Sequence, residues 1–144
     1  MGSGQQRVAD AGARQERWSD ERGSVELSRP RAGVVITKVS GFATPELGRR
    51  IIRWVDGSVR DGERPAVFHD WDGATGYEPE VRREFASWYA RVRKNVKEVH
   101  VLTRSKVVSM GISLVTLAVG EPVHAHSDRA AFEKALAAAL GSPG

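Results

Sequence analysis

The residue types that most often carry chemistry gather at two places in this sequence of 144 residues. His124 and His126 alternate, so on a strand they would point to one face, about 7 Å apart at the backbone. Together with Asp128 they could ligate a metal ion. Asp70 and Asp72 make a carboxylate pair of the kind used for magnesium binding or for acid–base work. Polar strand ends and loop hydrogen bonds account for such groups more often, so we expect no metal at either place.

The motifs of the common enzyme classes are missing from the sequence. It has no cysteine, which excludes thiolate zinc sites, iron–sulfur clusters and cysteine nucleophiles. No serine lies in a Gly-x-Ser-x-Gly elbow, and the glycine spacing fits neither the P-loop nor the dinucleotide fingerprint. His69 lies in a run that reads as a buried strand, where a core histidine is the ordinary interpretation. We predict a protein that is not an enzyme and that has no cofactor.

The net charge of +4 is concentrated in one segment. Between Val81 and Lys106 eight basic residues occur with only two acidic ones, which indicates a solvated helix face or a docking face for an acidic partner. No nucleic-acid-binding motif accompanies them, so we expect no nucleic acid partner. The N-terminus lacks the apolar core of a secretory signal, and serine, glycine and threonine interrupt the apolar run from Val107 to Val119. We expect a cytoplasmic protein without a transmembrane segment.

The hydrophobic pattern divides the chain into a tail and one domain. Residues 1–23 are mostly small or polar, with Val8 and Trp18 as large apolar residues, and we expect a flexible tail there. Residues 24–141 switch between period two and period 3.6 at short intervals. The expected strands are 25–28, 33–39, 65–69, 99–103 and 123–126, and the expected helices begin at Pro45, Pro79, Lys106 and Arg129.

This order of elements predicts an α/β fold. The first two strands read as a hairpin, and the later strands alternate with helices, which favours parallel pairing through right-handed crossovers. We predict a single mixed, mostly parallel sheet of about five strands with about four helices. Functional groups of such a sheet gather where strands give way to helices, here near residues 70–78, 103–106 and 126–128.

The helix expected over residues 106–119 is apolar almost all round, and such a helix must be covered. Three arrangements would cover it: packing on the sheet and the last helix, walling an apolar cavity, or forming a dimer interface. The face that would line a ligand cavity or a homodimer contact consists of Val108, Ile112, Val115 and Val119.

Three segments carry a family resemblance. They are the strand with its acidic end at 67–75 (VFHDWDGAT), the run at 99–119 (VHVLTRSKVVSMGISLVTLAV) and the ending SDRAAFEKAL. Together they are similar to a STAS domain of the SpoIIAA type (anti-sigma-factor antagonists), in the bacterial branch known as SpoIIAA-like or STAS/CRAL-TRIO-like. The resemblance follows the order of elements over residues 24 to 140. It implies a sheet backed by helices and a regulatory role exerted through contact with a protein partner.

The resemblance also implies a phosphorylation switch, from which this sequence departs. In phosphoregulated relatives an aspartate followed by a serine or threonine begins the helix after the acidic strand end. Glu78 occupies the position of that acid, and Pro79 and Glu80 occupy the hydroxyl positions. Negative charge is thus already present at the helix N-terminus, and we expect no switch at the usual site. Thr75 and Tyr77 are the nearby hydroxyls.

The leading hypothesis is a non-enzymatic regulatory or scaffold module that binds a protein partner through the strand–helix connection near residues 72–83. The alternative is a carrier or sensor of a small apolar ligand such as a lipid, held between the sheet and the helix 106–119, with peripheral lipid contact. A structural subunit that self-associates through the same helix is the third interpretation. The expected partner surface consists of Asp72, Thr75, Tyr77, Glu78, Glu80, Arg82 and Arg83.

Overall fold

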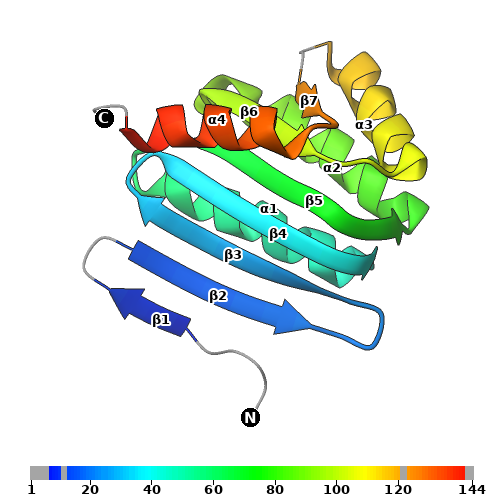
Figure 1. The fold of residues 1–144 in the computed structure, drawn as a ribbon, viewed down its shortest axis with the longest axis horizontal. Helices are drawn as coiled ribbons and strands as arrows, with labels where there is room; N and C mark the ends of the chain where they lie inside the picture. The colour runs from blue at the N-terminus through cyan, green and yellow to red at the C-terminus, as the bar shows by residue number, and fades with distance from the viewer. Residues whose placement is uncertain (1–6, 11–12, 121–122, 142–144) are drawn as a thin grey trace.

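The computed structural model describes residues 7–10, 13–120 and 123–141 and contains a sheet of seven strands in chain order. Strands β1 to β4 form an antiparallel meander, and β4 to β7 are parallel to one another (Figure 1). The strands are β1 (Arg7–Asp10), β2 (Ala13–Ser19), β3 (Gly23–Arg31), β4 (Val34–Ala43), β5 (Ala66–Tyr77), β6 (Glu98–Leu102) and β7 (His124–His126). The helices are α1 (Pro45–Arg60), α2 (Pro79–Val92), the 3-10 turn η1 (Arg93–Asn95), α3 (Lys106–Val119) and α4 (Arg129–Gly141).

The predicted α/β architecture of one mixed sheet with helices is confirmed, and the strand pairs from β4 onward are parallel. The four α-helices of the described residues begin at the residues expected from the sequence. Proline at the first helical position, preceded by an extended residue, starts α1 and α2. Ser105 caps α3, because its hydroxyl oxygen accepts a hydrogen bond from the Val108 amide.

Strands β1 and β2 lie in the segment that the sequence analysis expected to be a flexible tail. β2 pairs antiparallel with β3, with Trp18 opposite Val25. Trp18 is half-buried against the core, and the guanidinium of Arg50 lies 5.0 Å from its ring centre. The segment has few apolar residues and forms no core of its own. Backbone hydrogen bonds to β3 order β2 instead.

The helices cover both faces of the sheet. α1, α2 and α3 pack on one face, and α4 packs on the other (Figure 1). Helix α1 buries a stripe of Leu47, Ile51 and Val55 toward the sheet, and each such side chain contributes about 1.5 to 3 kcal/mol of burial free energy. Helix α4 is anchored by Phe132, whose ring lies 5.8 Å from that of Phe68.

Strand β5 is longer than the sequence predicts and replaces the loop expected at residues 70–78. After Asp70 it continues beside β4 through two register shifts, until Tyr77 pairs with Ala43. The strands come close at Gly73, where an added Cβ would lie 3.1 Å from the Ser40 hydroxyl oxygen. The expected partner surface therefore begins on β5 and not in a loop. Gly73 allows this part of β5 to lie close to β4.

Helix α3 ends at Gly120, whose φ of 79° is in the left-handed region that glycine favours. The break expected there from the sequence is thus present. In the described parts of the chain, no helix is both long and apolar enough to cross a membrane.

Candidate functional site

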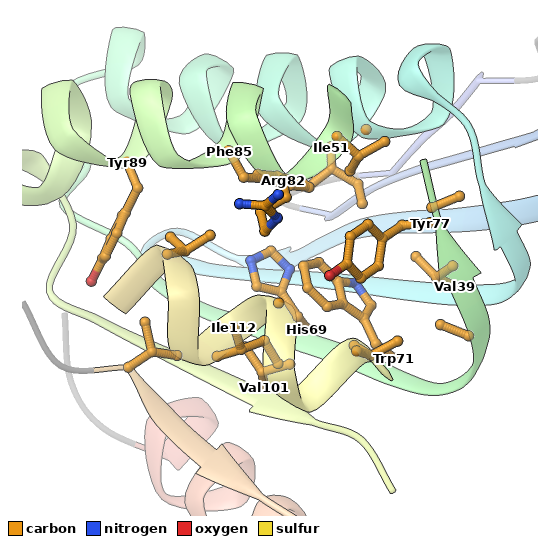
Figure 2. Close-up of a pocket in the computed structure, with 18 of the residues that line it drawn as sticks. Val39, Ile51, His69, Trp71, Tyr77, Arg82, Phe85, Tyr89, Val101 and Ile112 are labelled. Carbon is orange, nitrogen blue, oxygen red and sulfur yellow. The ribbon is translucent and has the colours of Figure 1, made fainter. Parts of the chain in front are cut away.

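A cavity of about 110 Å³ lies between the sheet and the helices α1, α2 and α3 (Figure 2). Strands β4, β5 and β6 form one wall and the three helices form the other, and nearly all lining side chains are apolar. Of the four residues expected on the covered face of α3, Val108, Ile112 and Val115 line the cavity, while Val119 packs against the adjacent core. Helix α3 is therefore both packed on the sheet and part of a cavity wall.

His69 is a buried titratable side chain in this wall, only 4% exposed. Its Nδ1 lies 2.7 Å from the hydroxyl oxygen of Thr37, which also accepts a hydrogen bond of 3.2 Å from the Trp71 indole. The proton of the Thr37 hydroxyl has no acceptor other than Nδ1 among the described residues. The hydroxyl therefore donates to Nδ1, and the imidazole proton resides on Nε2. Burial lowers the pKa of His69 to about 3, so the ring is neutral near pH 7.

Three polar groups border the cavity without a partner among the described residues. They are the Nε2–H of His69, the hydroxyl of Tyr77 and the guanidinium of Arg82. Figure 2 shows Arg82 reaching from α2, and His69 and Tyr77 from β5, into the space beneath α3. The otherwise apolar cavity thus offers hydrogen-bond donors and one permanent positive charge.

Helix α3 lies close over the cavity because residue 111 is glycine. A Cβ at Gly111 would lie 2.8 Å from Cζ of Tyr77. The Tyr77 ring therefore packs directly against the backbone of α3, which couples the position of this helix to the end of β5.

The carboxylate pair is neutralised by two arginines from other elements. Arg104 donates two hydrogen bonds of 2.9 Å to Asp72, and Arg129 donates to both oxygens of Asp70 at 3.0 and 3.1 Å. The hydrogen bonds from Arg104 hold the pKa of Asp72 below its ordinary value. These ion pairs join β5 to the connection before α3 and to the start of α4. Both carboxylates therefore have a structural role.

Histidines of β6 and β7 gather with an acidic residue on the face of the sheet that α4 covers. One potential ligand atom from each of Glu98, His100 and His124 lies within 4.8 Å of the others. His126 instead hydrogen-bonds His100, with 3.0 Å between the nitrogens, and the second nitrogen of His100 lies 2.9 Å from Glu98. Asp128 accepts a hydrogen bond from the backbone in the first turn of α4. Both nitrogens of His100 form hydrogen bonds, so a metal ion could bind there only by displacing one of them. We interpret these residues as a structural hydrogen-bond network.

The structure separates the residues of the expected partner surface. Tyr77 and Arg82 line the cavity. Glu78 and Glu80 each form an ion pair of 3.3 Å, with arginines of the β2–β3 turn and of α1 respectively, and Asp72 is held by Arg104. The exposed members are Thr75 and Arg83.

The outer side of α3 exposes large apolar side chains that the sequence analysis did not single out. Their spacing of three and four residues places them on one helix face, away from the cavity. The sequence could not identify this face, because apolar residues surround the whole helix. We call these residues the α3 stripe: Val107 (56% exposed), Met110 (65%), Leu114 (42%) and Leu117 (79%).

The position of Arg82 also differs from the expectation, which placed it on the solvent-facing side of α2. Positions 82 and 89 are seven residues apart, close to two helical turns, so Arg82 shares a helix face with the buried Tyr89. That spacing is the sequence signal that would have placed Arg82 on the cavity-facing side of α2.

Comparison with known proteins identifies the fold. No family model matches the chain, and no curated protein matches it. The crystal structure of an anti-sigma factor antagonist from Mycobacterium paratuberculosis is similar, with a TM-score of 0.59 and 16% sequence identity over 83% of this chain and 97% of that chain. An uncharacterized DUF3478-family protein with a SpoIIAA-like fold from Shewanella loihica PV-4 has a TM-score of 0.56 and 9% identity over 90% of this chain and 98% of that chain. The chain therefore has a SpoIIAA-like fold, as the resemblance in the sequence implies.

Proposed function

We propose that this chain is a regulatory module that binds another protein, and that the α3 stripe is the contact surface. The observation that carries the proposal is the exposure of four large apolar side chains on one helix face. Contiguous apolar patches on soluble proteins mark interaction sites, because water disfavours them until a partner covers them. In this proposal the chain acts by binding and not by catalysis.

The free energy available from the α3 stripe suits a reversible complex. Removing one Leu or Met side chain from water contributes about 1.5 to 3 kcal/mol. Several such side chains together offset part of the entropy lost on association. A partner that offers a complementary apolar groove would therefore bind without needing to bury a charge.

Two further features support a protein partner. Exposed polar residues of α3 itself, Lys106, Ser109 and Ser113, border the α3 stripe. An apolar centre with polar residues at its edge is the usual anatomy of a protein interface. The fold is also shared with a protein described as an anti-sigma factor antagonist, a description that refers to action on another protein.

The test replaces Met110 and Leu117 together by glutamate. Both side chains are largely exposed, so the thermal unfolding temperature should change little. Protein isolated gently from its own host and weighed by native mass spectrometry should carry a second polypeptide in fixed ratio when it is wild type, and should lack it in the double variant. The matched control is Lys134→Glu, an exposed position on α4 at the opposite face of the sheet, which should retain the partner.

Two outcomes would contradict this assignment. If the double variant retains the same polypeptide at the same ratio, the α3 stripe is not the contact. If the wild type is a homodimer that the double variant converts to monomer, the stripe serves self-association and not a different protein.

A second candidate function is the carriage or sensing of a small ligand, and the apolar cavity beneath α3 favours it. The cavity is partly open to solvent, and its apolar lining favours an apolar body over water. The same native mass spectra would reveal a bound ligand as an additional mass on the single chain.

A further inference from the structure

We propose that the cavity beneath α3 binds a small organic monoanion, namely a carboxylate with an apolar body about the size of a benzene ring, and that Arg82 pairs with its carboxylate. This inference rests on the second candidate function, a ligand in the cavity, and adds the chemical class of that ligand. The arguments come from the volume of the cavity, from its charge and from the donors that point into it.

The volume limits the apolar part of the ligand. The cavity measures about 110 Å³, and a cavity of about 150 Å³ lined by aliphatic and aromatic side chains holds one benzene molecule. A single ring or a chain of about five carbons therefore fills the space, and the remainder of a long acyl chain would have to extend out of it. The aliphatic and aromatic lining matches such a body.

The charge of the cavity selects an anion. Arg82 is half-buried and borders the apolar space, and no carboxylate among the described residues pairs with it. Other arginines of this chain have such partners: Arg49 pairs with Glu80, and Arg104 with Asp72. The described lining residues include no aspartate or glutamate. A guanidinium beside apolar surface gains most from a carboxylate, which it can bind through two parallel hydrogen bonds.

Two neutral donors complete the recognition of the head group. The Nε2–H of His69 and the hydroxyl of Tyr77 have no partner among the described residues and face the cavity. Carboxylate oxygens accept several hydrogen bonds at once. Because His69 stays neutral, Arg82 is the charged group among the described lining residues. A ligand with a single negative charge balances the charge of Arg82. A cationic ligand of equal size would meet Arg82 with no carboxylate to compensate.

The experiment is calorimetric titration of the full chain with three probes of nearly equal size: benzoate, benzyl alcohol and benzylamine. We expect the wild type to bind benzoate at least about ten-fold more tightly than benzyl alcohol, since a charge-assisted hydrogen bond distinguishes them. Benzylamine should bind most weakly. Arg82→Gln should bind benzoate and benzyl alcohol with similar affinity, while Arg83→Gln, its exposed neighbour, should keep the wild-type preference. Thermal unfolding of each variant checks that it is folded.

The outcomes separate the failure of this inference from the failure of ligand carriage. Equal affinity of the wild type for benzoate and benzyl alcohol would overturn the monoanion but leave an apolar ligand. A preference for benzoate that persists in Arg82→Gln would overturn the role of Arg82. If none of the three probes binds, both this inference and the second candidate function are wrong.

Discussion

Among single residues, His69 links the interior of the sheet to the cavity. One ring nitrogen accepts the hydrogen bond from Thr37, and the other presents a proton to the space beneath α3. Its neutral state depends on burial, which lowers its pKa to about 3. The unfolded chain would protonate the same ring near its ordinary pKa of about 6.5. Acid therefore favours the unfolded chain.

This difference predicts the pH dependence of stability. The contribution of His69 is fully present above about pH 6.5, and it is lost as the pH falls toward about 3, because only the unfolded chain gains the proton in that window. Between about pH 7 and pH 5 the free energy of unfolding of the wild type should fall by about 2 kcal/mol more than that of His69→Gln. Urea unfolding at both pH values measures this, and an equal fall in the two proteins would show that the native imidazole takes up protons normally.

Arg82 illustrates what the sequence predicts and what it does not about the site. The sequence analysis correctly treats His69 as buried, because a β-rich apolar run surrounds it. It places Arg82 at the surface, because arginine is usually exposed. The position of Arg82 around the axis of α2, on the same face as the large apolar residues, was not used. Whether an arginine meets a carboxylate depends on residues far away in the sequence, which local patterns do not contain.

Among the elements, α4 depends on one side chain. Of its residues only Phe132 is fully buried, 2% exposed, and its ring contacts both Phe68 and His126. Arg129 adds ion pairs to Asp70 and Asp72, but its side chain is about half exposed to solvent. Solvent screening limits the contribution of such pairs to about 1 kcal/mol. Hydrophobic packing of Phe132 therefore dominates the attachment of α4.

We accordingly predict that Phe132→Ala lowers the free energy of unfolding by about 3 to 5 kcal/mol. Lys134→Ala, two residues away on the exposed side of the same helix, should change it by less than about 0.5 kcal/mol. Chemical denaturation of both variants measures the difference. A loss below about 1 kcal/mol for Phe132→Ala would mean that the ion pairs of Arg129, and not packing, hold α4.

The bounds of the elements show which information is local. Helices α1, α2 and α3 start where the sequence indicates, because proline, an acidic first turn and a serine cap are signals within a few residues. The extension of β5 to Tyr77 was not predictable in this way, since Gly73 and Gly76 read as a loop, and pairing with β4 overrides that preference. Strand β2 was missed for the same reason: its order comes from β3, not from its own composition.

For the molecule as a whole, α3 serves two surfaces at once. Its inner face contributes Val108, Ile112 and Val115 to the cavity, and its outer face carries the α3 stripe. A ligand in the cavity and a partner on the stripe would therefore contact opposite sides of one helix. In this arrangement, any ligand that shifts α3 changes the surface that the partner meets.

The measurement that decides the role of the α3 stripe is amide hydrogen exchange of the chain, alone and in the complex reconstituted with the purified partner. Exchange reports which backbone segments become covered or more stable on binding. We predict that peptides spanning residues 106–119 exchange markedly more slowly in the complex, while those of α4 are unchanged, because α4 lies on the other face of the sheet. Protection confined to α4 or to the β1–β2 edge, with residues 106–119 unaffected, would contradict binding through the α3 stripe.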